Sequence, residues 1–357
     1  MFGLPPLPPH FHAAVRDVEA KRPESRMAAA ERLGRAEGEN ERTAALAGLA
    51  RLAKDPHAGV RATALAALGL LADEGQLEIV SAGLSDPFPE VREFAALALG
   101  QIGGAGALSS LKTALRHTSP EVRFHAAAGV AELDPDHAAA ALVPLLDDPD
   151  PDVRAQVVSA LSSLDEPHLT GQLARGLSDA VWSVRLEAAL ALASHADSRG
   201  EQALLTALAR RERVTEVIAA LVELKTESAR EPLAQLASAW LTPPATRASA
   251  GAALARLGDP RGLSALRRVL HGLRSEARSY AVELTRELAA NAELGADLAR
   301  LADRPRGADL LALVDALAHH AVHSPPARSA LERLAARSDA VGHAARELVQ
   351  RTAFERG

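Results

Sequence analysis

A dipeptide, Val-Arg, returns at intervals of 31 residues along the chain, and this spacing constrains the fold more than any other feature. A repeat this short cannot enclose a core of its own, so successive repeats must bury each other's apolar faces. The chain is therefore predicted to be a linear stack and not a globule. The dipeptide occurs at Val60-Arg61, Val91-Arg92, Val122-Arg123, Val153-Arg154 and Val184-Arg185. Weaker copies hold the same register at Thr215, Thr246-Arg247 and Ala277-Arg278, and Ser25-Arg26 looks like an earlier copy at a longer spacing.

Apolar residues divide each repeat into two helices. In the first clear copy, Val60, Ala64, Leu68 and Leu71 stand at offsets that share one face of an α-helix. A second stripe of leucines and valines follows 20 and 24 residues after each repeat valine. We call the first helix of a repeat helix A and the second helix B. With no strand pattern of period two, the fold class is all-α, with about ten A–B pairs and a terminal helix.

Aspartate and arginine recur at fixed places around the start of each helix A. An aspartate stands five residues before most repeat valines, usually followed by proline. Asp suits the N-cap and Pro the first helical turn, so each Asp-Pro is predicted to start a helix A. The repeat arginine can then reach the aspartate of its own or the adjacent layer, although a row of arginines could instead recognise a ligand carboxylate or phosphate. We predict a structural ladder formed by Asp55, Arg61, Asp86, Arg92, Asp148, Arg154, Asp179 and Arg185.

The pattern Asp-Pro-x3-Val-Arg-x2-Ala-x3-Leu resembles the HEAT-repeat family, especially the short bacterial form called phycobilisome-lyase-like HEAT repeats. The resemblance covers residues 55–192 well and residues 25–350 loosely. It implies a right-handed α-solenoid, a superhelix of armadillo-like type, with helix B lining the concave face. It also implies a protein-binding scaffold, although this motif specifies a fold more strongly than a function.

Composition excludes several kinds of chemistry. The chain has no cysteine, which excludes disulfides, thiolate catalysis and cysteine-ligated metals. No apolar run is long enough to span a membrane, and the first residues lack the pattern of a signal peptide, so we expect a cytoplasmic protein with no membrane insertion. Prolines within residues 4–9 predict a polyproline II arm that is disordered or packs on the first repeat.

No motif for catalysis or cofactor binding stands out, so we expect no catalytic, cofactor-binding or metal residues. A protein that is not an enzyme is favoured, although an enzymatic activity stays open. His319, His320 and His323 form a cluster, but no carboxylate lies at a matching turn, and the helix is predicted to end there. The acidic run of Asp147, Asp148, Asp150 and Asp152 lacks the glycine and distal glutamate of a calcium loop. The two tryptophans, at positions 182 and 240, are predicted to fill space, with exposed binding anchors as the alternative.

Charge changes along the chain. Residues 1–178 carry 16 Lys and Arg against 24 Asp and Glu, whereas residues 179–357 carry 24 against 22. The exposed face of helix B is therefore predicted to turn mildly basic toward the C-terminus. With a pI of about 6.1, the chain lacks the continuous basic stripe that nucleic acids require. The predicted partner-binding residues on this face are Glu78, Lys112, Arg116, Arg175, Thr206, Arg210, Arg267, Arg268 and His271.

The leading hypothesis is a non-enzymatic scaffold or adaptor that binds another protein or a peptide segment along the concave face. Two alternatives stay open: a bilin lyase-like subunit acting on a carrier protein, which arginines and aromatics around a cavity would favour, and a nucleic-acid-binding array. The less regular repeats after residue 210 are the expected place for specialised contacts, although simple drift of the sequence is equally permitted. The expected segments are residues 1–11 as an arm, 12–40 as a cap, 41–339 as the repeat array and 340–357 as a terminal helix.

Overall fold

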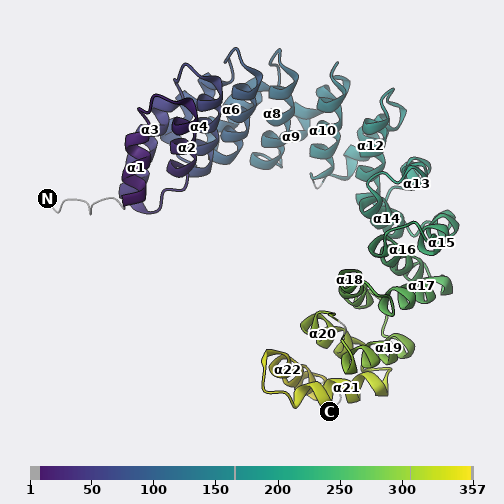
Figure 1. The fold of residues 1–357 in the computed structure, drawn as a ribbon. Helices are drawn as coiled ribbons and strands as arrows, with labels where there is room; N and C mark the ends of the chain where they lie inside the picture. Colours follow the sequence, from purple (N-terminus) through teal and green to yellow (C-terminus); the bar gives the residue numbers. More distant parts are fainter. Residues whose placement is uncertain (1–8, 165, 306, 355–357) are drawn as a thin grey trace. The chain divides into compact units, whose positions relative to one another are not determined.

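The computed structural model describes residues 9–164, 166–305 and 307–354. Every regular element among these residues is a helix (Figure 1). The chain divides into two compact units, residues 1–195 and 196–357. Within each unit the even-numbered α-helices are the predicted helices A, and each packs against the helix A of the neighbouring layer. The odd-numbered helices are the predicted helices B. The all-α stack of helical pairs that the 31-residue period predicts is confirmed in each unit.

Among its described residues, the first unit holds one leading helix, five A–B pairs and one further helix A, α12. The leading helix is α1, Pro9–Asp17. The helices A are α2 (Pro23–Leu33), α4 (Ala58–Leu71), α6 (Pro89–Ile102), α8 (Pro120–Leu133), α10 (Pro151–Ser162) and α12 (Trp182–Ser194). The helices B are α3 (Gly38–Leu52), α5 (Leu77–Gly83), α7 (Gly104–Ala114), α9 (Ala138–Leu142) and α11 (Thr170–Arg175). Short 3₁₀ turns adjoin several of them: η1 (Glu74–Gln76), η2 (Val143–Asp147), η3 (Pro167–Leu169) and η4 (Gly176–Ser178).

The second unit repeats this arrangement with less regular spacing. Its helices A are α14 (Val214–Glu223), α16 (Pro244–Arg256), α18 (Ser275–Thr285), α20 (Leu310–His320) and α22 (Ala340–Phe354). Its helices B are α13 (Glu201–Arg210), α15 (Arg230–Ser238), α17 (Pro260–Leu270), α19 (Ala292–Asp303) and α21 (Pro325–Ala335), and its 3₁₀ turns are η5 (Ser198–Gly200) and η6 (Glu227–Ala229). The predicted array of residues 41–339 thus spans both units.

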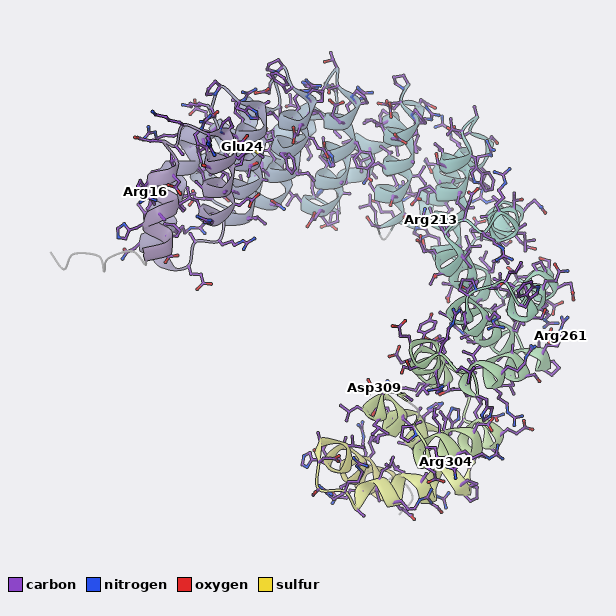
Figure 2. The ribbon with its side chains drawn as sticks, in the orientation of Figure 1. Arg16, Glu24, Arg213, Arg261, Arg304 and Asp309 are labelled. Atoms are coloured by element: carbon purple, nitrogen blue, oxygen red, sulfur yellow. The ribbon has the colours of Figure 1, made fainter. Side chains whose placement is uncertain are left out.

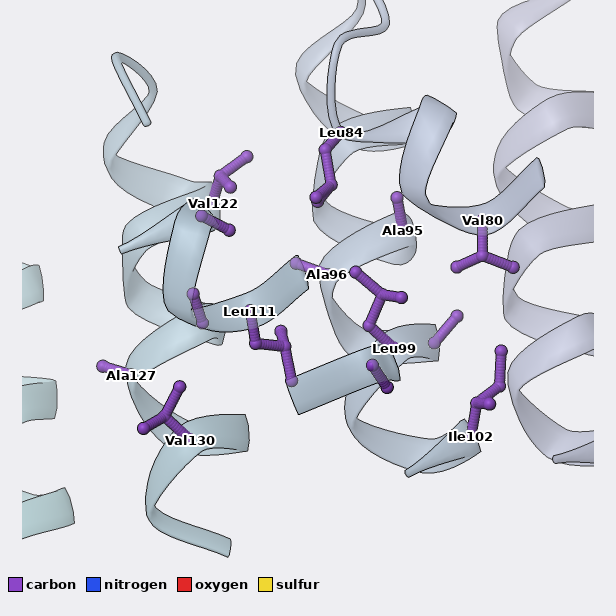
Figure 3. Packing of buried hydrophobic residues seen from close by; sticks show 14 of the residues in the cluster. Val80, Leu84, Ala95, Ala96, Leu99, Ile102, Leu111, Val122, Ala127 and Val130 are labelled. Carbon is purple, nitrogen blue, oxygen red and sulfur yellow. The ribbon is translucent and has the colours of Figure 1, made fainter. Parts of the chain in front are cut away.

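Each unit has its own apolar core, built from the stripes that define helices A and B. In the first unit, Ala95 and Leu99 of α6 are buried in one cluster with Val80 of α5 and Leu111 of α7 (Figure 3). Burying one such leucine or valine contributes about 1.5–3 kcal/mol. The helices of one layer cover these side chains on one side only. The stabilisation therefore depends on the neighbouring layer, whose helices cover the other side.

Small residues set how closely the helices approach. Gly69 of α4 faces α6, where a Cβ atom on the glycine would lie only 2.8 Å from the Cα atom of Ala98. Gly262 of α17 lies closer still to the backbone of α16, where a Cβ atom on the glycine would lie 2.5 Å from the Gly251 carbonyl oxygen. The high content of alanine and glycine on these faces therefore follows from the packing distance between helices.

The ends of the chain bear on two sequence expectations. Helix α1 begins at Pro9, inside the segment expected to be an arm, and residues 1–8 of that arm lie outside the described residues. At the other end, α22 covers residues 340–354 of the expected terminal helix. Among the described residues, no helix combines the length and apolar character needed to cross a bilayer.

A buried histidine ties α20 to the connection between α18 and α19. The His320 ring is fully buried; its Nδ1 accepts a hydrogen bond from the Asn291 amide at 2.9 Å, and its Nε2 donates to the Thr285 carbonyl at 3.1 Å. This pattern requires a neutral ring, since a proton on Nδ1 would face the Asn291 N–H. Burial, together with the neighbouring His319, lowers the pKa of His320 to about 4.

We therefore expect stability to fall as the solution is acidified. The unfolded chain binds a proton at His320 below about pH 6.5 and the folded chain does not, so this stabilisation is complete above that pH and is lost toward pH 4. The expected loss between pH 7 and 5.5 is about 1 kcal/mol. Urea unfolding across this range measures it. A His320→Asn variant should be less stable at pH 7 but show a flatter pH dependence; equal slopes would contradict the assignment.

Candidate functional site

One edge of the first unit carries a row of arginine–aspartate pairs that join neighbouring layers. The arginine is the fourth residue of a helix A, and the aspartate lies in the loop that precedes the next helix A. Each guanidinium binds both carboxylate oxygens through its Nε and one terminal nitrogen, a geometry that Arg supplies and Lys does not. The pairs are Arg26–Asp55 (2.6 and 2.8 Å), Arg61–Asp86 (2.8 and 2.8 Å), Arg123–Asp148 (2.7 and 2.7 Å) and Arg154–Asp179 (2.7 and 2.9 Å).

The aspartates do not cap the helices, so the predicted N-cap role is wrong. Asp86 lies two residues before the N-cap residue of α6, Phe88, and its carboxylate accepts the Phe88 amide hydrogen at 3.0 Å in a local turn. Pro87 therefore lies outside the first helical turn, which begins at Pro89. The carboxylate is directed along the edge of the stack, where the preceding layer's arginine meets it. The same local turn holds Asp55, Asp148 and Asp179.

The ladder keeps its arginines even where an aspartate is missing. His117 occupies the aspartate position after α7, and Arg92 binds Ser119 and Glu121 instead. At the end of this unit, Arg185 donates to the carbonyls of Asp179 and Ala180. Carboxylates in the ladder are held ionised. The Arg154 hydrogen bonds lower the pKa of Asp179. For Asp148 burial raises the pKa, but the hydrogen bonds from Arg123 and the Asp150 amide, together with the charges of Arg123 and Arg154, outweigh burial and lower it.

In the second unit one step of the ladder has its arginine but lacks the aspartate. Arg247 is the fourth residue of α16, the ladder arginine of that layer, but the aspartate position in the next loop is occupied by Gly272. The Nε of Arg247 is buried and has no hydrogen-bond partner among the described residues. Arg247 and Gly272 line a pocket of about 390 Å³ between the α15–α16 and α17–α18 loops. The lining holds three arginines, Arg247, Arg268 and Arg274, and no acidic residue.

Three large apolar side chains stand exposed around this pocket. Trp240 is 82% exposed, Leu241 72% and Leu273 94%. The prediction that Trp240 fills space is therefore wrong, because the loop turns its ring away from the core, whereas Trp182 is half-buried and lies 5.3 Å from the Arg185 guanidinium. We call the surface formed by Trp240, Leu241, Leu273, Arg247, Arg268 and Arg274 the Trp240 surface. Apolar side chains with arginines at their edge are typical of protein interaction sites.

A second pocket lies one repeat further along the same unit, at the C-terminal ends of α17 and α19. It has a volume of about 480 Å³ and is lined by His271, Arg278, Arg300, Asp303 and Arg304, the last of which is labelled in Figure 2. Arg278 is almost fully buried and donates to the Gly272 carbonyl at 2.6 Å. Asp303 pairs with Arg333 at 2.7 Å.

Several of the predicted partner-binding residues form contacts within the stack. Lys112 pairs with Asp134 at 2.7 Å and Arg175 with Asp147 at 2.8 Å. The buried Asp297 side chain binds Arg267 at 2.5 Å and His271 at 3.2 Å. Thr206 donates to its own helix, at the Gln202 carbonyl. Glu78, Arg116 and Arg210 are exposed, and Arg268 lies on the Trp240 surface.

The candidate metal residues also have local roles. His319 contacts the Leu288 carbonyl at 2.7 Å, while Asp150 caps α10 through the amides of Asp152 and Val153. Within the described part of the chain, no group of three or more His, Asp or Glu side chains is placed to hold a metal ion.

Comparison with known proteins reports on the fold. A family model described as HEAT repeats matches residues 48–118, 110–193 and 139–223. The karyopherin Kap121p, bound to the extreme C-terminus of the protein phosphatase Cdc14p, has 15% identity and a TM-score of 0.56, covering 91% of this chain and 44% of the karyopherin. A homology model of the AP-3 complex has 14% identity and a TM-score of 0.54, covering 93% of this chain and 73% of that one.

A phycocyanin lyase complex of CpcE and CpcF from a Nostoc species has 20% identity and a TM-score of 0.43, covering 67% of this chain and 93% of that one. None of the curated proteins compared matches the chain. At these identities the likeness concerns the fold alone.

Proposed function

We propose that the chain is a HEAT-repeat scaffold that binds another protein, with the Trp240 surface as the main contact; the match of residues 48–223 to the HEAT-repeat model supports the scaffold. The observation that carries this proposal is the exposure of Trp240, Leu241 and Leu273 together around one pocket. Leaving three large apolar side chains in water costs free energy that a partner's apolar groups can recover. Tryptophan is also the residue type most enriched among the side chains that dominate binding energies.

The stack holds this surface in place before a partner arrives. Trp240 and Leu241 lie in the α15–α16 loop and Leu273 in the α17–α18 loop, and the helices α16, α17 and α18 pack against each other within one unit. Binding therefore orders few additional groups, which lowers the entropic cost of association. The karyopherin of similar fold binds the C-terminus of another protein, so a chain segment is a ligand that helical stacks of this kind can hold.

The helix B face remains a predicted second contact region. Glu78, Arg116 and Arg210 are exposed along it. Lys112, Arg175 and Arg267 are committed to pairs with neighbouring layers, so their charges are largely compensated. We therefore place the principal contact at the Trp240 surface and not along the helix B row.

Removing the apolar anchors should abolish partner capture. The immobilised chain and a Trp240→Ala/Leu273→Ala variant are exposed to lysate of the source organism, and the bound proteins are quantified by mass spectrometry. We expect at least a tenfold loss of the specific partners, since an anchor of this kind contributes about 2 kcal/mol or more. Leu70→Ala, which shortens an exposed leucine of α4 in the other unit, is the matched control and should retain them. Equal capture by both variants would show that the surface is not the contact.

Binding of a bilin is the second candidate, favoured by the same residues. An open-chain tetrapyrrole presents an apolar conjugated system and two propionates, which would meet Trp240 and the arginines of the pocket. The pocket volume falls within the usual range for small-molecule sites. Titration of biliverdin followed by absorbance decides this case: a spectral shift that disappears in Trp240→Ala supports a bilin, and an unchanged spectrum excludes it.

A further inference from the structure

The position of Gly272 is structurally equivalent to that of the ladder aspartates. Gly272 lies two residues before the N-cap residue Arg274, as Asp86 lies two residues before Phe88. Its amide donates to the Val269 carbonyl at 3.0 Å, as the Asp86 amide donates to the Gly83 carbonyl at 3.1 Å. Gly272 also follows Arg247 by 25 residues, the separation of Arg61 from Asp86. The backbone thus keeps the form of a ladder step while the carboxylate is missing.

The arginine of this step keeps its sequence position, as the fourth residue of its helix A, α16. In the complete steps, the Nε of the ladder arginine donates to the aspartate of the next layer. In Arg247 the same nitrogen is buried without a partner among the described residues, and it lies at a pocket whose lining has no acid. An unsatisfied buried donor on a charged group costs more than a neutral one. A carboxylate entering the pocket from outside would remove this cost.

We propose that Arg247 binds an aspartate or glutamate side chain of the partner, which takes the place of the missing ladder aspartate. An apolar residue next to it in the partner packs on Trp240, Leu241 and Leu273, while Arg268 and Arg274 attract further acidic residues. The occupant is therefore an extended acidic segment with at least one large apolar side chain. This inference rests on the proposed scaffold function and specifies the chemistry of its partner.

A library of random 12-residue peptides displayed on phage and selected on the full-length chain tests the proposal. We expect the enriched peptides to share an acidic residue beside leucine, phenylalanine or tryptophan. The affinity of one enriched peptide is then measured by fluorescence anisotropy for wild type and variants. Arg247→Gln should weaken binding at least tenfold, because the carboxylate loses its charged donor.

Gly272→Asp is the sharper variant, since it supplies the carboxylate from within the chain. The new side chain should pair with Arg247, compete with the peptide and weaken binding at least tenfold. Gly272→Asn is the matched control: it has the same size and meets the same 3.0 Å contact with the Val269 carbonyl oxygen, but it carries no charge. We expect it to weaken binding no more than threefold. Thermal unfolding of each variant shows that the fold is retained.

The outcomes separate this inference from the function on which it rests. If Trp240→Ala/Leu273→Ala loses the peptide but Arg247→Gln and Gly272→Asp bind it like wild type, the carboxylate assignment is wrong and the scaffold stands. Enriched peptides without an acidic residue overturn the assignment in the same way. If selection yields no peptide and the apolar variant captures the same proteins as wild type, the proposed function itself fails. Displacement of the peptide by single-stranded DNA at lower concentration than by a second acidic peptide would also overturn the inference.

Discussion

Replacing Arg123 by methionine is expected to lower the free energy of unfolding of the first unit by about 3 kcal/mol. The Arg123 and Asp148 side chains are only 11% and 5% exposed, so the variant leaves a carboxylate shielded from water without its main partner. It also removes the bonds from Arg123 to the carbonyls of His117 and Thr118, which hold the loop before α8. Urea unfolding, combined with amide hydrogen exchange in α8 and α10, locates the loss.

Two further variants show whether the loss comes from the buried charge. Arg175→Met breaks the pair with Asp147. The Arg175 side chain is 55% exposed and that of Asp147 is 70% exposed, so the change in the free energy of unfolding should be no more than about 0.5 kcal/mol. Arg123→Met combined with Asp148→Leu should recover most of the stability, because no charge is left unpaired. If Arg123→Met and Arg175→Met prove equally mild, the ladder does not stabilise the stack.

Gly262→Ala is expected to destabilise the second unit by about 3 kcal/mol, the upper range for overpacking a core. A Cβ atom on Gly262 would lie 2.5 Å from the Gly251 carbonyl oxygen and closer still to the backbone nitrogen of Ala255. These are backbone atoms, so α16 and α17 would have to move apart and lose contacts along their whole interface. Urea unfolding and hydrogen exchange in these two helices measure the effect.

Gly171→Ala is the matched control for this prediction. Gly171 lies in helix α11, and no heavy atom outside its own helix lies within 4 Å of the added Cβ. Alanine should therefore raise stability by about 0.5 kcal/mol, through its better helix propensity. If Gly262→Ala were as stable as wild type, the close approach of α16 and α17 would not require glycine.

The stacked layers could be predicted because each helix follows from a local pattern of apolar residues, and that pattern recurs with a fixed period. Val60, Ala64 and Leu68 share a face through helix geometry alone, and recurrence every 31 residues puts the same face in every layer. The role of Asp86 in its turn was not predictable in the same way. Asp-Pro is compatible both with an N-cap and with a turn two residues earlier, and the choice between them depends on where the arginine of the neighbouring layer lies.

The Trp240 surface was not predicted from the sequence. It lies where the repeat pattern lacks a ladder aspartate, and sequence reasoning did not consider that absence. The burial of a tryptophan depends on the loop that holds it, so composition alone could not show that Trp240 is exposed. A signal was nevertheless present. Continuing the register of Asp55, Asp86, Asp148 and Asp179 reaches Leu241 and Gly272, where the acid is absent while Arg247 persists.

The ladder also determines how the protein can vary in length. Arg61 and Asp86 are 25 residues apart in a repeat of 31 residues, so the arginine of one layer pairs with an aspartate of the next layer. Each pair therefore depends on two adjacent layers and on no other. Excising residues 117–147 would put Arg92 the same 25 positions ahead of Asp148, giving it the aspartate that its present neighbour lacks. Gain or loss of whole layers is thus a change in size that the ladder can absorb. Arg26 and Asp55, which are 29 residues apart, still form both bonds, so a longer segment between arginine and acid is also accommodated.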